Sequence, residues 1–321
     1  MSAQAKPRLM VFSGNSNPQL GQEIAGYLGV ELGRVKLSKF SNGEIYVKFL
    51  ESVRGADIFL IQTMCEPVND RLMELLVMID ALKRASAERI SAVIPHYGYA
   101  RQDKKTTARE PITAKLIADL LTTAGADRML SMDLHAGQIQ GFFDVPVDHL
   151  TSLPVLTGYF REKKFKDLVI VSPDVGRVKL AKKFADKLGA ELAILHKTRP
   201  AHNVAEIGHV IGDVDGKVAL LVDDMVDTAG TICEGAKTLR ASGAKRVFAC
   251  ATHPILSGPA IERINASPIE ELVVTNTVPV ERPDELPKIK VLSIAQIFAQ
   301  TILNVYEDES VSAIFEEDNF I

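Results

Sequence analysis

The chain has 321 residues, of which 46% are hydrophobic and 24% charged, and its formal net charge is −4. At roughly 150 residues per domain this length predicts two domains, and the mild acidity without a clustered basic face excludes the usual footprint of a nucleic-acid-binding protein. Its apolar runs fall short of the ~18 residues of a membrane span and its three cysteines are widely spaced, so no membrane partner, a cytoplasmic location and reduced thiols are expected.

Short runs rich in Val, Ile and Leu recur along the chain, separated by amphipathic helical stretches. Such runs are typical of strands buried on both faces of a parallel sheet. Asn17-Pro18 and Gly29 mark the start and end of the first helix, and Glu110-Pro111 and Gly125 bracket another. The predicted fold class is α/β with doubly wound parallel sheets. The expected strands are Arg8–Phe12, Asp57–Thr63, Ile90–Ile94, Arg128–Met132, Leu168–Val171, Val218–Val222, Arg246–Ala251 and Leu272–Thr275.

The two halves of the chain resemble each other. Leu9–Gly29 and Val169–Gly189 both read as a strand, a serine-containing turn and a helix that stops at Leu-Gly. A repeat of about half the chain is too long for a solenoid and predicts two homologous domains. We expect them at residues 1–150 and 151–299, with residues 300–321 rejoining the first domain.

A cluster of acidic and small residues follows the expected strand at 218–222. In α/β sheets ligands bind at the carboxyl ends of the strands, and a turn of small residues before a helix can direct backbone N–H groups toward a phosphate. The carboxylates of Asp223 and Asp224 are acceptors that suit the vicinal hydroxyls of a ribose; taken alone, an acidic pair could equally cap a helix or bind a metal. The residues expected to hold ribose 5-phosphate are Asp223, Asp224, Asp227, Thr228, Ala229, Gly230 and Thr231.

Leu221–Thr231 resembles the phosphoribosyl-diphosphate motif of type I phosphoribosyltransferases, and the chain from about Leu9 to Phe315 resembles the ribose-phosphate diphosphokinases. The resemblance implies two phosphoribosyltransferase-like domains. It also implies Mg²⁺-dependent transfer of the β,γ-diphosphate of ATP to the C1 hydroxyl of ribose 5-phosphate. The products would be AMP and 5-phospho-α-D-ribose 1-diphosphate, which feeds nucleotide, histidine and tryptophan biosynthesis. The further strings that carry the resemblance are Phe40–Glu44, Glu51–Gly55, Tyr97–Asp103, Met132–Phe143, Ser172–Gly176, Thr252–Pro259 and Glu309–Phe315.

The resemblance assigns the ATP and metal residues by position. Phe40–Glu44 alone reads as a surface turn, and the family pattern implies that this loop reaches a neighbouring subunit's site. A lone histidine such as His135 is more often structural than a metal ligand. The implied ATP-binding residues are Phe40, Asn42, Gly43, Glu44, Arg101, Gln102 and His135, and the implied Mg²⁺ ligands, from different domains, are His135 and Asp174.

A charged segment at His196–Gly208 shows little helical or strand periodicity. Taken alone it would be a solvated loop. The resemblance implies a flexible catalytic loop in which Lys197 and Arg199 clamp the transferred diphosphate.

Regulation and assembly follow from the resemblance alone. It implies a homo-oligomer, usually a hexamer, and a phosphate or ADP effector site that includes Arg109, Ser310, Ser312 and Phe315.

Three positions depart from the family pattern. Arg177 replaces a second glycine in a turn expected to face the diphosphate, Leu180 replaces an arginine, and Thr106 replaces an acidic residue. Residues 316–321 run past the usual end of the family and carry no interpretation.

Two other functions fit parts of the sequence. A salvage phosphoribosyltransferase would share the 223–231 motif but would need one such domain. A catalytically silent regulatory subunit would be expected to have lost the residues at Lys197, Arg199, His135 and Asp174, which are all present.

Overall fold

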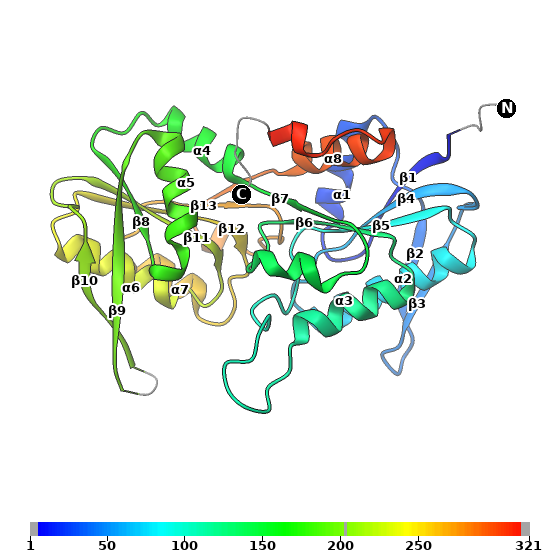
Figure 1. Ribbon diagram of the computed structural model, residues 1–321, viewed down its shortest axis with the longest axis horizontal. Helices are drawn as coiled ribbons and strands as arrows, with labels where there is room; N and C mark the ends of the chain where they lie inside the picture. Colours follow the sequence, from blue (N-terminus) through cyan, green and yellow to red (C-terminus); the bar gives the residue numbers. More distant parts are fainter. Residues whose placement is uncertain (1–5, 202–203, 316–321) are drawn as a thin grey trace. The chain divides into compact units, whose positions relative to one another are not determined.

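In a computed structural model that describes residues 6–201 and 204–315, the chain divides into two compact units (Figure 1). Unit 1 combines the chain up to Thr151 with the segment from Ser293 onward, and unit 2 is Ser152–Leu292. Residues 293–299, which the sequence prediction gave to the second domain, therefore belong to unit 1. The reason is that Ala295 and Phe298 are buried in the core of unit 1.

Unit 1 is built on a parallel sheet with the strand order β1-β4-β5-β6-β7. Successive side chains of a strand point to opposite faces, so each face has its own core. Phe12 and Leu60 face α2 and α3, whereas Val11 and Phe59 face α1 and α8. The strands are β1 (Arg8–Ser13), β4 (Ala56–Ile61), β5 (Arg89–Ile94), β6 (Arg128–Met132) and β7 (Val147–Leu150), and the helices are α1 (Pro18–Leu28), α2 (Val68–Arg84), α3 (Thr113–Ala124) and α8 (Ala295–Glu307), with 3₁₀ turns η1 (Gly137–Phe142) and η4 (Ser312–Phe315).

The ends of α1 follow the sequence prediction. The Asn17 side chain accepts a hydrogen bond from the Leu20 amide at 3.2 Å, and Gly29 ends the helix with φ 69°. By contrast, α3 begins at Thr113 rather than at Pro111, and no side chain caps it. Glu110 does not cap this helix because its carboxylate bonds back to Thr106 and Thr107.

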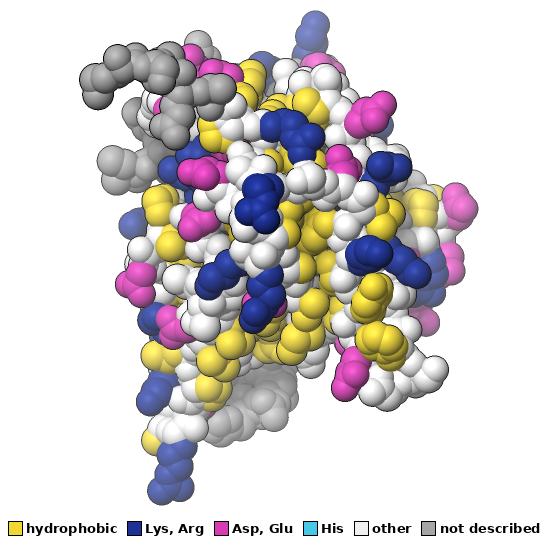
Figure 2. All heavy atoms as spheres, turned by 90° about the vertical axis from the view of Figure 1, so that its right-hand side faces the viewer, with side chains coloured by type: hydrophobic (Ala, Val, Ile, Leu, Met, Phe, Trp, Pro, Cys, Tyr) yellow, Lys and Arg dark blue, Asp and Glu magenta, His cyan; other side chains and the backbone are white. Residues whose placement is uncertain are grey.

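An antiparallel hairpin, β2 (Val35–Lys39) and β3 (Ile45–Phe49), lies beside α2 in unit 1. Only alternate residues of the hairpin face the core, which is why no continuous apolar run predicted it. Figure 2 faces the side of unit 1 that carries this hairpin and shows hydrophobic side chains exposed among Lys and Arg. Phe40 and Tyr46 are exposed large hydrophobic residues of the hairpin.

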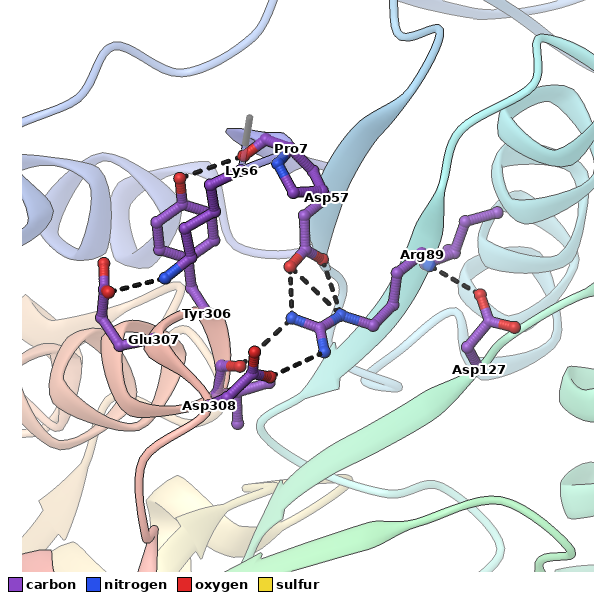
Figure 3. Close-up of polar contacts among 10 residues, drawn as sticks. Lys6, Pro7, Asp57, Arg89, Asp127, Tyr306, Glu307 and Asp308 are labelled. Carbon is purple, nitrogen blue, oxygen red and sulfur yellow. Dashed lines mark hydrogen bonds and ion pairs between the residues drawn. The ribbon is translucent and has the colours of Figure 1, made fainter. Parts of the chain in front are cut away.

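A cluster of polar contacts connects helix α8 to the first residues of strands β4 and β5 (Figure 3). The Arg89 guanidinium bonds the Asp57 carboxylate, donates to the Val305 carbonyl at 3.1 Å and lies 3.7 Å from an Asp308 oxygen. Asp57 is only 3% exposed, so Arg89 neutralises a nearly buried carboxylate. The hydroxyl of Tyr306 donates to the Pro7 carbonyl at 3.0 Å. These contacts hold the end of α8 against the sheet, and so they set the position in space from which the following segment starts.

Unit 2 has a larger sheet with the strand order β10-β9-β8-β11-β12-β13-β14, in which only the β9–β10 pair is antiparallel. One face packs against α4 and α5, the other against α6 and α7. The strands are β8 (Leu168–Ser172), β9 (Glu191–Ala201), β10 (Val204–Ile211), β11 (Val218–Val226), β12 (Arg246–Pro254), β13 (Leu272–Thr275) and β14 (Ile289–Leu292), and the helices are α4 (Leu153–Glu162), α5 (Val178–Leu188), α6 (Gly230–Ala241) and α7 (Ala260–Ala266), with 3₁₀ turns η2 (Val175–Arg177) and η3 (Pro283–Glu285).

The parallel strands of the two sheets are connected in the same order. The parallel order β1-β4-β5-β6-β7 of unit 1 returns in unit 2 as β8-β11-β12-β13-β14. In each unit an antiparallel hairpin follows the helix that comes after the first strand: β2–β3 follows α1, and β9–β10 follows α5. The doubly wound α/β fold predicted from the sequence is confirmed. Among the described residues, none of the helices has the length and apolarity needed to cross a bilayer.

Candidate active site

The acidic pair lies within strand β11. The sequence prediction ended this strand at Val222, but it continues to Val226 because β12 is long enough to pair with it, Asp223 opposite Ala251 and Met225 opposite His253. The turn at 227–229 then leads into α6, which begins at Gly230. The strand therefore carries two carboxylates near its end, and the turn that follows leads into a helix.

Ala229 takes a left-handed backbone conformation, with φ 58°, at the N-cap of α6. A non-glycine residue in this conformation costs of order 1–2 kcal/mol, and such strain is concentrated at functional sites. Gly230 opens the helix, and the side chains of Thr228 and Thr231 are exposed beside it. The first backbone N–H groups of a helix have no partner within the helix, so this end of α6 can receive an anion.

The turn is supported by residues that the sequence analysis did not single out. Ser257 donates its amide to the Asp227 carbonyl at 3.1 Å and its hydroxyl to the Asp227 carboxylate. Arg263 of α7 donates to the Thr228 carbonyl at 3.0 Å. Both residues lie in or just after the string at 252–259 that carries part of the family resemblance, so the only signal for them was that string.

Arg177 reaches the acidic pair. Its Nε lies 3.3 Å from Asp223 Oδ1, and its Nη2 lies 2.9 Å from Asp224 Oδ2. The turn was expected to direct this position toward a diphosphate, but the guanidinium is bound to the two carboxylates instead. Burial and then repulsion from Asp224 raise the pKa of Asp223 well above its ordinary value, and Arg177 opposes this shift.

Asp174 caps the short helix η2. One of its carboxylate oxygens, Oδ1, accepts the amides of Gly176 at 2.8 Å and Arg177 at 3.2 Å. Within residues 6–201 and 204–315, no group of three or more His, Cys, Asp or Glu side chains is arranged to hold a metal ion. Asp174 still fits Mg²⁺, because this ion is often held by one or two carboxylates together with substrate phosphates and water.

The Phe40–Glu44 turn closes the hairpin β2–β3 of unit 1. Gly43, with φ 93°, donates its amide to the Phe40 carbonyl at 2.8 Å, and Phe40 donates to the Glu44 carbonyl at 2.8 Å. The Asn42 side chain accepts the Glu44 amide at 3.2 Å. Phe40 is 54% exposed, and its ring lies 5.6 Å from that of Tyr46 in a T-shaped arrangement. Its exposed apolar surface can accept a stacked aromatic ring.

Arg101 and Gln102 follow β5 and are exposed. The Gln102 side chain accepts a hydrogen bond from the Thr113 hydroxyl at 2.5 Å, which ties this loop to the first turn of α3. His135 lies half-buried after β6. The loop that carries it is held by His149, whose Nε2 accepts the Leu134 amide at 2.8 Å. The sequence analysis did not assign His149, which lies on the neighbouring strand β7.

The segment around Lys197 is a β-hairpin and not the irregular loop that the sequence suggested. The backbone of β9 includes Lys197 and Arg199, and Lys197 pairs with Ile207 of β10. Hydrogen bonds between backbones form this hairpin, with two register shifts, so a regular side-chain pattern is not required. The side chains of Lys197 and Arg199 lie outside the described part of the structure.

The residues expected in an effector site are in unit 1. Arg109 is exposed, with φ 70°. The hydroxyls of Ser310 and Ser312 are 2.8 Å apart. The Phe315 side chain and residues 316–321 lie outside the described residues.

Sequence profiles of known families match two segments. Residues 9–125 match the N-terminal domain of ribose phosphate pyrophosphokinase, and residues 203–316 match a phosphoribosyl synthetase-associated domain.

Curated relatives match over almost the whole chain. A ribose-phosphate pyrophosphokinase of Clostridium acetobutylicum is 59% identical over 97% of this chain and 98% of its own. One of Bacillus subtilis is 54% identical over 96% and 97%. A crystal structure of phosphoribosylpyrophosphate synthetase from Mycobacterium smegmatis aligns with a TM-score of 0.89 and 51% identity, covering 94% of this chain and 99% of the other.

Proposed function

Because this chain belongs to the ribose-phosphate pyrophosphokinase family, and is therefore an enzyme that makes phosphoribosyl diphosphate from ribose 5-phosphate and ATP, we propose that its two units divide the substrates between them. Unit 2 binds ribose 5-phosphate and unit 1 binds ATP. The observation that carries this division is the difference between two equivalent strands. Strand β11 leads through an acidic pair into a small-residue turn and α6, whereas β4 is followed by the buried Gln62 and Thr63.

In unit 2, the start of α6 receives the 5-phosphate through backbone N–H groups and the hydroxyls of Thr228 and Thr231. Asp223 and Asp224 accept hydrogen bonds from the ribose hydroxyls. This orientation presents the C1 hydroxyl to the β-phosphorus of ATP, and AMP is the leaving group.

Unit 1 supplies the ATP contacts: Arg101 and Gln102 hold the polyphosphate. Phe40 stacks on adenine in a neighbouring subunit's site, where Asn42 and Glu44 contact the edge of the base. Asp174 and His135 are the proposed protein ligands of Mg²⁺. When bound, the ion neutralises charge on the transferred phosphoryl groups. Lys197 and Arg199 stabilise the charge that develops on the diphosphate.

We extend the proposal to the setting of the enzyme. A homo-oligomer, a hexamer by family resemblance, would cover exposed apolar residues such as Phe40. Phosphate and ADP are the proposed effectors, at Arg109, Ser310, Ser312 and Phe315. The proposed location is the cytoplasm.

The test is release of AMP from ATP with ribose 5-phosphate as the only other substrate, in the presence and absence of Mg²⁺, inorganic phosphate and ADP. We expect one AMP per phosphoribosyl diphosphate formed, and no AMP without ribose 5-phosphate. Turnover of phosphoribosyl diphosphate with a nucleobase, without AMP release, would indicate the phosphoribosyltransferase alternative, which the relatives do not favour. A chain inactive in both assays would fit a silent subunit.

A further inference from the structure

Arg177 joins two strands of unit 2 at the proposed ribose site. It comes from the turn after β8, and its forked side chain bonds both carboxylates at the end of β11. The side chains of Arg177, Asp223 and Asp224 are 20%, 19% and 6% exposed. The contact is therefore an ion pair shielded from water on most sides, where geometry and charge both matter more than at the surface.

Without a nearby cation, the carboxylates of Asp223 and Asp224 would not both stay ionised. Two carboxylates that share a poorly hydrated site repel each other, and one of them takes up a proton. The pKa of Asp223 is raised by burial and by Asp224, and Arg177 and the Asp224 amide lower it. The other titratable group that faces Asp223 among the described residues is the buried Cys250 thiol on β12. Arg177 is thus the cation that opposes protonation of the pair.

The backbone of Arg177 is itself held in place. Its amide donates to the Asp174 side chain at 3.2 Å, and the Ser172 hydroxyl donates to the Asp174 carbonyl at 2.7 Å. A guanidinium presents N–H groups in a rigid planar fork, which a lysine ammonium cannot reproduce. A fixed backbone and a fixed fork together set the spacing of the two carboxylates.

We propose that Arg177 is a positioning residue for ribose 5-phosphate, whose guanidinium holds Asp223 and Asp224 at the spacing that accepts hydrogen bonds from the ribose hydroxyls. This inference rests on the proposed function. Each ionised carboxylate offers about four lone-pair sites, so two N–H groups of Arg177 leave acceptor capacity for hydroxyls. Arg177 therefore assists the sugar rather than competing with it. Family members with glycine at this position lack the guanidinium.

Steady-state kinetics of Arg177→Gln and Arg177→Lys test the proposal. Arg177→Gln keeps most of the side-chain length and one donor group but loses the charge. We expect the KM for ribose 5-phosphate to rise roughly tenfold, because losing a hydrogen bond to a charged group has about this effect. We expect kcat and the KM for ATP to change less than about twofold, because the defect lies in sugar binding. Arg177→Lys should recover part of the loss. The matched control is Lys182→Gln, an exposed cation on α5 that pairs with Asp186 on the same helix.

Chemical rescue separates positioning from a structural role. In Arg177→Gly, added methylguanidinium at millimolar concentration should lower the KM for ribose 5-phosphate by at least threefold, whereas methylammonium should not. An unchanged KM in Arg177→Gln overturns the inference. So does a loss shared equally by kcat and both KM values without rescue. If the wild-type chain releases no AMP, the proposed function fails; an active wild type with an unaffected Arg177→Gln variant overturns only the role of Arg177.

Discussion

Glu110 receives hydrogen bonds from the amides and hydroxyls of both Thr106 and Thr107, at 2.7–2.9 Å. These bonds favour the ionised carboxylate and lower its pKa to about 2. An acidic residue at position 106, as in some family members, would repel Glu110 instead. Thr106, a neutral hydrogen-bond donor, is therefore compatible with the ionised Glu110. This compatibility gives a physical account of the departure from the family pattern.

We predict that Thr106→Ala raises the pKa of Glu110 from about 2 toward its ordinary value of 4.5. The pKa of Glu110 is lower in the folded state than in the unfolded state. Its hydrogen bonds to Thr106 and Thr107 therefore contribute their full stability above the unfolded pKa, and this contribution is lost as pH falls through about 2. The pKa of Glu110 can be followed by NMR titration of its side-chain carboxyl carbon. Thr122→Ala on α3 is the control. An unshifted Glu110 would show that the bonds to Thr107 and the local backbone suffice.

Lys197 is predicted to act on the transition state. Lys197→Ala should lower kcat by about 10²–10³, the usual effect of removing one donor to developing charge, with little change in ATP affinity. Lys182→Ala, on the exposed side of α5, is the control for loss of a lysine. Rapid kinetics with AMP as the readout checks the rate, and calorimetry with ATP checks binding. A variant that turns over near the wild-type rate would remove Lys197 from the proposed machinery.

The sequence showed which residues belong to the proposed ribose site more readily than it showed which residues contact them. The acidic pair and the small-residue turn could be identified because they are contiguous in the sequence. Arg177, Ser257 and Arg263 could not be connected to them, because they come from the turn after β8 and from the segment after β12. Contacts between segments far apart in the sequence depend on the sheet order, which local patterns do not contain.

At the scale of elements, α8 depends on the Arg89 cluster. Arg89→Met should lower the free energy of unfolding of unit 1 by about 3 kcal/mol, because removing one partner leaves the Asp57 charge nearly buried and unpaired. The control is Arg84→Met, since the pair of Arg84 with Asp80 on α2 is largely exposed and its loss should leave the urea midpoint almost unchanged. Urea unfolding measures both. Equal effects of the two substitutions would contradict a specific role for the cluster.

The elements that sequence patterns predicted share one property. The central strands of the parallel sheets are buried on both faces, as in β4, where all six residues are buried, and they are largely apolar. Strands β7 and β14 are the last in their sheets, are only partly buried, and were not predicted. The hairpins β2–β3 and β9–β10 were missed because their side chains alternate or carry charge. These hairpins contain Phe40, Lys197 and Arg199. These two hairpins therefore had weak structural signals in the sequence, and only the family resemblance indicated their proposed ligand contacts.

At the scale of the whole chain, the duplication assigns different tasks to equivalent parts. The hairpin after the first strand and its helix carries the proposed adenine contact in unit 1 (β2–β3) and the proposed catalytic cations in unit 2 (β9–β10). The helix that follows the last strand also changes unit. Helix α4, which follows β7, packs in the core of unit 2, and α8, which follows β14, packs in the core of unit 1. Unit 1 thus needs a helix from the far end of the chain to complete its core, whereas unit 2 is one continuous segment, Ser152–Leu292.

The metal should be needed for turnover but not for folding. With Asp174 and His135 as its proposed protein ligands, Mg²⁺ should bind the free chain weakly, because this ion is usually held by one or two carboxylates together with substrate phosphates and water. A ligand that binds the folded state weakly adds little stability, so EDTA should shift the melting temperature by less than about 2 °C while abolishing AMP release. Added Mg²⁺ should restore activity, and Asp174→Asn should raise the concentration required. A fall in melting temperature of more than roughly 5 °C on chelation would indicate a metal site preformed in the free chain.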